Sequence, residues 1–316
     1  MGLQVGIVGA GLMGHGISQV FATAGHCVRI TDADQRVLNQ VPGRISASLV
    51  ELGVEAASVL ARIHLSPSLA ETVDGCDVVI EAVSERLELK RTLFKQISEI
   101  APRDALLASN TSSIPITQIG RDLPNHARRR LVGLHWWNPP VLMPLVEVIR
   151  TDFVDPSFFD RAFELMRSVE KEPVKVEKDI PGFIGNRLMH AFWREAISLV
   201  EIGVCDAETI DIVVKRGFGL RLPVLGPMEN ADLVSLELTR DIQKVIFPDL
   251  EKSSEPSPLL DRLITEHKLG MGTGEGLRKW SPNQIADTKR ELSGHLLKTL
   301  RNGKHLGAST NSEQCL

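Results

Sequence analysis

The sequence predicts an α/β fold in which a doubly wound parallel sheet is followed by an all-α domain. Short apolar runs, typical of buried parallel strands, alternate with helical patterns as far as Ile149. A glycine-rich turn joins the first of these strands to a helix, and after Gly182 only helical patterns follow. We therefore expect two domains, residues 1–182 and residues 183–316.

The elements are expected in a regular order. The first strand lies within residues 3–8, a helix follows that ends near Ala24, and a second strand at 27–31 ends at Asp32. Residues 34–74 are expected to be mostly helical, with a short strand at 63–65. The other predicted strands are 77–83, 105–108, 131–135, 145–149 and 173–176, and helices are predicted at 85–100, 156–169, 186–202, 207–215, 230–247, 258–266 and 285–300.

Gly9, Gly11 and Gly14 form a G-x-G-x-x-G pattern between the first strand and the first helix. In this setting the first glycine permits a tight turn, the second lets the backbone approach a pyrophosphate, and the third allows close packing of helix and strand. The helix N-terminus offers free N–H groups to the phosphates. The pattern predicts a dinucleotide site of the Rossmann type.

Asp32, at the end of the second strand, indicates which dinucleotide is bound. Its carboxylate would accept hydrogen bonds from the adenosine ribose and repel a 2′-phosphate, which favours NAD over NADP. Arg29 and Arg36 lie close in the sequence and keep NADP as a lesser alternative, and FAD proteins also use this pattern.

His135 stands at the end of an apolar run, just before Asn138-Pro139-Pro140 turns the chain. Ligands of doubly wound sheets bind beyond the carboxyl ends of the strands, and histidine is the usual general base near neutral pH. Glu147, in the next apolar run, would fix the tautomer of His135 and stabilise its imidazolium. The competing interpretation is a buried histidine bonded to the backbone, with Glu147 as a solvent-facing residue.

Three further polar residues are candidates for the same site. Ser112 and Glu85 follow predicted strands and are expected at the same edge of the sheet. Asn186 opens the first helix of the second domain, where an N-cap is the simpler interpretation. Its amide would alternatively reach back and hold a substrate oxygen.

Composition and charge exclude several functions. The formal net charge is −4, and the basic cluster 128–130 is short and lacks flanking aromatic residues, so we expect no nucleic-acid partner. No apolar stretch approaches the roughly 20 residues that span a bilayer, so we expect no membrane partner. The four cysteines are scattered, which indicates reduced thiols and no metal site, and the absence of a signal-peptide pattern fits a cytoplasmic protein. The absence of tyrosine excludes a tyrosine general acid.

Taken together, these residues resemble the L-3-hydroxyacyl-CoA dehydrogenase family over nearly the whole chain. The segments that carry the resemblance are Gly9-x-Gly-x-Met-Gly14, Glu81-Ala-Val-Ser-Glu85, Ser109-Asn-Thr-Ser-Ser113, Gly133-Leu-His-Trp-Trp-Asn138, Leu145-Val-Glu-Val148 and Asp179-Ile-Pro-Gly-Phe-Ile-Gly-Asn-Arg187. Their order and spacing are highly specific.

The resemblance implies a role for each candidate. His135 is the base that takes the 3-hydroxyl proton as hydride leaves for NAD, and Glu147 orients it. Ser112 and Asn186 hold the 3-oxygen and the acyl carbonyl. Positions near the nicotinamide ribose are matched by Glu85, Lys90 and Asn138. It also implies a homodimer formed through the helical domain and a place in fatty acid metabolism.

The chain departs from the family pattern in two places that bear on which substrate it uses. Members that use CoA hold its phosphates partly with a lysine-bearing helical segment, whereas Arg44 and Arg62 are the only cations of residues 37–80. The segments 217–222 and 226–229 resemble the lambda-crystallin (L-gulonate 3-dehydrogenase) and carnitine dehydrogenase branch, and Arg221 would pair there with a substrate carboxylate. A surface or dimer-interface arginine is the alternative. Residues 270–276, in contrast, resemble 3-hydroxybutyryl-CoA dehydrogenases.

The sequence thus predicts an NAD-dependent dehydrogenase that oxidises the 3-hydroxyl of an L-3-hydroxyacyl-CoA. The alternative is the same chemistry on a free 3-hydroxy acid, such as a sugar acid or hydroxybutyrate. A β-hydroxyacid dehydrogenase would need a lysine base, and residues 186–202 contain no lysine. A structural protein of the crystallin type that retains NAD binding is a further, non-enzymatic alternative. The family pattern usually has two phenylalanines where this chain has Trp136-Trp137.

Overall fold

A computed structural model of the protein describes residues 2–306. The described residues form two compact units: the first holds residues 2–187 and 294–306, and the second holds residues 188–293. The predicted boundary between two separate domains, after Gly182, stays a prediction. Among the described residues, no helix is both long and apolar enough to cross a membrane.

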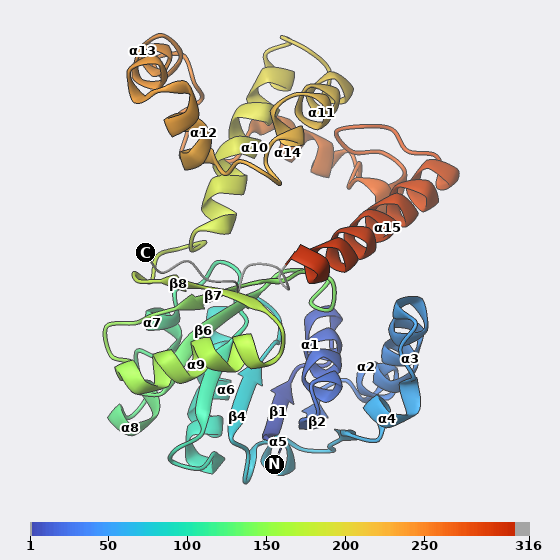
Figure 1. Ribbon diagram of the computed structural model, residues 1–316, viewed down its shortest axis with the longest axis vertical. Coiled ribbons are helices and arrows are strands. Elements are labelled where there is room, and N and C mark those ends of the chain that lie inside the picture. Colours follow the sequence, from blue (N-terminus) through green and yellow to red (C-terminus); the bar gives the residue numbers. More distant parts are fainter. Residues whose placement is uncertain (1, 307–316) are drawn as a thin grey trace, which may run out of the picture. The chain divides into compact units, whose positions relative to one another are not determined.

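An eight-stranded sheet organises the first unit (Figure 1), in the order β3-β2-β1-β4-β5-β6-β7-β8. The strands are β1 (Gln4–Val8), β2 (Cys27–Thr31), β3 (Ile63–Leu65), β4 (Val78–Glu81), β5 (Leu106–Ser109), β6 (Leu131–Trp136), β7 (Leu145–Ile149) and β8 (Glu172–Val176). The pairs from β3 to β6 are parallel, and the strand order reverses between β1 and β4. The predicted doubly wound Rossmann-type fold is confirmed.

The sheet departs from the predicted all-parallel arrangement at β7, which runs antiparallel to β6. A parallel pair needs a crossover of a dozen or more residues, and the connection 137–144 is shorter than that. The chain therefore turns straight back, and β8 then pairs with β7 in parallel. The antiparallel register sets His135 directly opposite Glu147.

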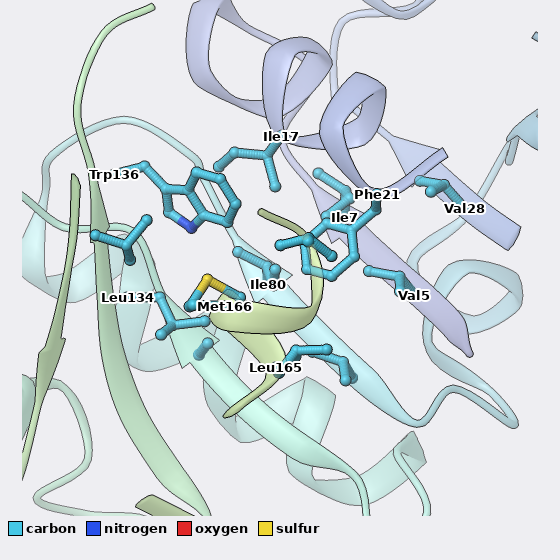
Figure 2. Close-up of a cluster of buried hydrophobic side chains, with 14 of the residues drawn as sticks. Val5, Ile7, Ile17, Phe21, Val28, Ile80, Leu134, Trp136, Leu165 and Met166 are labelled. Carbon is cyan, nitrogen blue, oxygen red and sulfur yellow. The ribbon is translucent and has the colours of Figure 1, made fainter. Parts of the chain in front are cut away.

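Helices cover both faces of the sheet, and each face has its own apolar core. The helices of this unit are α1 (Leu12–Thr23), α2 (Gln35–Asn39), α3 (Val41–Leu52), α4 (Ala56–Leu60), α5 (Leu69–Val73), α6 (Leu87–Ile100), α7 (Ile116–Ile119), α8 (Asn125–Arg128) and α9 (Pro156–Ser168). On one face, α1 and α9 pack on strand residues such as Ile80 and Leu134 (Figure 2), and α3 packs on α1. On the other, α5, α6 and α7 surround Val79 and Leu107. Adjacent strand residues separate in this way because their side chains point to opposite faces.

The second unit is helical, as predicted, but one helix differs. The elements from residue 185 onward are α10 (Gly185–Glu201), α11 (Ala207–Arg216), η1 (Phe218–Leu220), α12 (Pro227–Val234), α13 (Leu236–Ile246), α14 (Pro258–Thr265), η2 (Met271–Thr273) and α15 (Pro282–Leu306). The prediction of one helix over 230–247 is wrong, because the chain breaks at Ser235, where φ is 84°. The Ser235 hydroxyl accepts a hydrogen bond from the Leu238 N–H and so caps α13 as a new helix.

Candidate active site

The predicted site residues of the first unit gather at one edge of the sheet. The loops after β1, β4 and β5 and the end of β6 all lie at the carboxyl ends of parallel strands. This is the edge at which doubly wound sheets bind their ligands.

The glycine-rich loop has the geometry that its three glycines predict. Gly9 has a φ of +104°, which side-chain-bearing residues rarely adopt. A Cβ on Gly14 would lie 1.8 Å from the Gly9 carbonyl oxygen, so only glycine lets α1 start this close to β1. A Cβ on Gly11 would meet nothing within 4 Å, so open space adjoins the loop where a pyrophosphate has to approach.

Asp32 is anchored at the end of β2 beside this loop. One carboxylate oxygen accepts the Ala10 N–H at 2.7 Å and the other accepts the Asp34 N–H at 2.8 Å. The side chain is only half-buried, so it can still accept ribose hydroxyls. These residues fit the diphosphate and the adenosine ribose of NAD.

His135 and Glu147 form a buried pair. The His135 Nδ1 lies 2.7 Å from a Glu147 carboxylate oxygen, and both side chains are nearly inaccessible to solvent. Because a carboxylate only accepts hydrogen bonds, the ring proton lies on Nδ1, and Nε2 keeps a free lone pair. The pair has the geometry of a general base and its orienting partner.

The other Glu147 oxygen is bound to the start of α10. It accepts the N–H groups of Ile184 and Gly185, at 2.9 and 3.0 Å. Burial by itself raises the pKa of Glu147, but the hydrogen bonds from His135 and from these two N–H groups outweigh it, so the pKa falls below its ordinary value. Glu147 is therefore ionised at neutral pH.

Replacing Glu147 with Gln is expected to destabilise the protein in a pH-dependent way. A carboxyl pKa that is lower in the folded state stabilises the fold above the unfolded value of 4.5, and this stabilisation is lost as the pH falls through the folded value. The difference in unfolding free energy between wild type and variant should be roughly 1.5–3 kcal/mol at neutral pH and shrink in acid. Urea denaturation at several pH values measures this difference in unfolding free energy. If the difference is the same at acid pH as at neutral pH, Glu147 is not stabilised as a carboxylate in the folded state.

The loop after β5 presents Ser112 and is held on both sides. One oxygen of Glu85 accepts the N–H groups of Ser112 and Ser113, each at 3.0 Å, and the Thr111 hydroxyl at 2.6 Å. On the other side, the Asn186 side-chain amide donates to the Ser112 carbonyl at 2.7 Å. The Ser112 residue is exposed, so its hydroxyl is available to a ligand.

A buried ion pair that the sequence did not suggest lies behind this loop. The Lys90 ammonium is 2.7 Å from Glu81 and 3.4 Å from Glu85, and the side chains of Lys90 and Glu81 are fully buried. Glu81 also accepts the Ser109 hydroxyl at 2.6 Å. Lys90 thus contacts Glu85 from within the protein, and its predicted place near the nicotinamide ribose stays a prediction. In the sequence, Glu81 is a charged residue at the end of an apolar strand, and this pattern could have indicated that it has a buried partner.

The remaining predicted residues are placed as follows. Asn138 is exposed after β6, and its contact with the nicotinamide ribose stays a prediction. Arg221 belongs to the second unit, where it is exposed just after η1. Within residues 2–306, no group of three or more His, Cys, Asp or Glu side chains is arranged to hold a metal ion.

Both halves of the chain match family models. Residues 4–180 match the NAD-binding domain of 3-hydroxyacyl-CoA dehydrogenase, and residues 182–280 match its C-terminal domain.

Curated relatives extend over most of the chain. It is 31% identical to 5-formyl-3-hydroxy-2-methylpyridine 4-carboxylate 5-dehydrogenase of Mesorhizobium japonicum, covering 94% of this chain and 97% of the relative. It is 36% identical to human mitochondrial hydroxyacyl-coenzyme A dehydrogenase, covering 88% and 91%.

Two solved structures show the same fold. A structure of the pyridine-carboxylate 5-dehydrogenase, described as an NAD⁺-dependent dismutase, has a TM-score of 0.88 at 31% identity and covers 95% of this chain and 98% of its own. The (S)-3-hydroxybutyryl-CoA dehydrogenase of Ralstonia eutropha has a TM-score of 0.72 at 32% identity and covers 89% and 100%. With the dinucleotide loop and the His135–Glu147 pair in place, these matches show that the chain is an NAD-dependent oxidoreductase that belongs to the 3-hydroxyacyl-CoA dehydrogenase family.

Proposed function

We propose that the protein oxidises the 3-hydroxyl of an L-3-hydroxyacyl-CoA to the 3-keto product, with His135 as the general base. The observation that carries the proposal is the buried His135–Glu147 contact of 2.7 Å, which leaves Nε2 free to accept a proton. In this proposal, Ser112 and Asn186 supply the hydrogen-bond donors for the substrate oxygens. We further propose that residues 1–182 bind NAD and that residues 183–316 form the substrate and dimerisation domain.

In this reaction His135 Nε2 takes the hydroxyl proton as the C3–H bond breaks, and NAD, when bound, accepts the hydride. The imidazolium that forms is stabilised by the ionised Glu147, which is already bonded to Nδ1. Because Glu147 is anchored by two backbone N–H groups, the ring has a fixed orientation before the substrate binds.

Ser112 and Asn186 are proposed to hold the substrate oxygens. The Ser112 hydroxyl would donate to the 3-oxygen, since its backbone is fixed by Glu85 on one side and Asn186 on the other. One proton of the Asn186 amide is used on the Ser112 carbonyl, which leaves the other for the acyl carbonyl.

A second candidate is the same oxidation of a free hydroxy acid, and two observations favour it. A relative that covers nearly the whole chain acts, by its name, on a pyridine carboxylate. In the helices after β2, the guanidinium of Arg44 donates to Gln40 and that of Arg62 donates to the Ser58 carbonyl. With no lysine in residues 37–80, this segment offers CoA phosphates few cations.

The two candidates are tested by comparing kcat/KM for 3-hydroxybutyryl-CoA with kcat/KM for free 3-hydroxybutyrate. Each reaction is monitored by the reduction of NAD. If the free acid is a substrate, Arg221→Ala should lower its kcat/KM about 10- to 100-fold, the loss expected for a charged hydrogen-bonded pair, and leave any activity with the CoA ester unchanged. Arg216→Ala, at an exposed position nearby, is the matched control. A strong preference for the CoA ester would remove the carboxylate role of Arg221, and no reduction of NAD with any 3-hydroxy substrate would favour the structural alternative.

We also propose that the chain forms a homodimer through its helical domain. Within residues 188–293, all of which are described, Leu259 alone is buried. Large apolar side chains stay exposed along this segment, among them Phe192, Trp193, Val224, Met228 and Val245. Exposed apolar surface on this scale marks an interface with another chain. Light scattering after size-exclusion chromatography should give twice the mass of one chain, and a monomer at micromolar concentration would contradict the proposal.

A further inference from the structure

The His135 imidazole is held by more than its contact with Glu147. Trp137 and Phe183 both lie against its ring, with centroid distances of 5.4 and 5.6 Å and the same interplanar angle of 51° for both. Phe183 is fully buried and has a φ of 50°, a conformation that a bulky residue adopts only when its surroundings enforce it. The hydrogen bond to Glu147 fixes one edge of the imidazole, and the two aromatic rings pack against it.

Trp137 in turn packs against the first turn of α10. A Cβ on Gly185 would lie 2.4 Å from Cζ2 of Trp137 and 3.1 Å from Cη2, closer than atoms can approach without a shift. Gly185 is not among the glycines with a positive φ, so its backbone conformation would accept a side chain. What excludes a side chain at position 185 is the six-membered ring of Trp137.

The same turn of α10 is bonded to Glu147 through the N–H groups of Ile184 and Gly185. Two side chains therefore connect His135 to this turn: Glu147 through hydrogen bonds and Trp137 through packing. If the turn shifts, both supports of the imidazole shift with it.

We infer that Trp137 and Gly185 form a size-matched pair that positions His135, so that Trp137 is a positioning residue for the proton transfer. The inference rests on the proposed role of His135 as the base. Trp137 acts here through its shape, because its indole N–H is buried and has no hydrogen-bond partner within the described residues. A phenylalanine at 137 would keep a ring beside His135 and lose the atoms that meet Gly185.

Three variants test the pair: Gly185→Ala, Trp137→Phe and the double variant. Gly185→Ala should lower kcat about 10- to 100-fold, because small displacements of a catalytic group have effects of this size. Its KM for NAD should not change, since the glycine-rich loop is untouched. Trp137→Phe alone should have a smaller effect, and adding it to Gly185→Ala should restore kcat to near that of Trp137→Phe. Gly43→Ala, where a Cβ meets nothing within 4 Å, is the matched control.

A second readout needs no substrate. The ¹⁵N resonances of the His135 ring report which nitrogen carries the proton: Nδ1–H should dominate in wild type, be disturbed in Gly185→Ala, and return in the double variant. If no 3-hydroxy substrate is oxidised by wild type, the proposed function fails, while these spectra still test the pair. Wild-type kcat and spectra in Gly185→Ala, or a double variant as impaired as Gly185→Ala in both measurements, would overturn the inference.

Discussion

Replacing His135 with Gln should lower kcat for NAD reduction by roughly 10²- to 10⁴-fold, the usual contribution of a general base. Glutamine is close in size to histidine and can still hydrogen-bond to Glu147, but it cannot take a proton from the substrate. The glycine-rich loop and Asp32, which fit the diphosphate and the adenosine ribose of NAD, are unchanged in this variant, so it should bind NADH with the wild-type Kd.

Steady-state kinetics together with a fluorescence titration of NADH separate these two effects. A loss of both kcat and NADH binding would indicate a folding defect, and circular dichroism would detect it. Turnover near the wild-type value with intact binding would rule out His135 as the base.

Replacing Lys90 with Met should destabilise the protein by about 3–5 kcal/mol, the range found when one partner of a buried ion pair is removed. Glu81 would then stay buried without the Lys90 ammonium that contacts it at 2.7 Å. The loss follows mainly from this unpaired charge. Urea denaturation at neutral pH measures it.

A double variant, Lys90→Met with Glu81→Gln, separates this cause from lost packing. It removes both charges and should recover much of the stability, since neutral replacements of a buried pair are often tolerated. Lys95→Met, at an exposed position on the same helix, should have little effect. A Lys90→Met variant as stable as Lys95→Met would show that the pair contributes little.

The parts of the fold that follow from local pattern could be predicted from the sequence. The apolar runs of β1, β2 and β4, the glycine turn and the acidic residue after β2 each have a local signature, and the structure has them where the pattern places them. The sequence also predicts the pairing of His135 with Glu147, because His135 ends a predicted strand and Glu147 lies in the next apolar run. The reversal at β7 was also accessible, since the connection 137–144 is too short for a parallel crossover.

Other features depend on contacts that a single sequence does not display. The burial of Lys90 arises because the first turn of α6 meets the end of β4, and an isolated helix would present this lysine to solvent. The sequence has a helical pattern on both sides of Ser235, so the break between α12 and α13 cannot be recognised from the local pattern. The fit of Trp137 to Gly185 joins two segments that are distant in the sequence, and nothing local marks it.

The cross-strand register of β6 and β7 has a consequence for how this protein can diverge. His135 and Glu147 are opposite one another because backbone hydrogen bonds fix the pairing, and a slip of one residue would turn the carboxylate to the other face of the sheet. Insertions and deletions between the two strands are therefore tolerable only where the loop 137–144 absorbs them. Beyond Trp137 and Asn138, the loop can change in length and composition while the base and its partner stay together, so new substrates can be accommodated without rebuilding the proton-transfer pair.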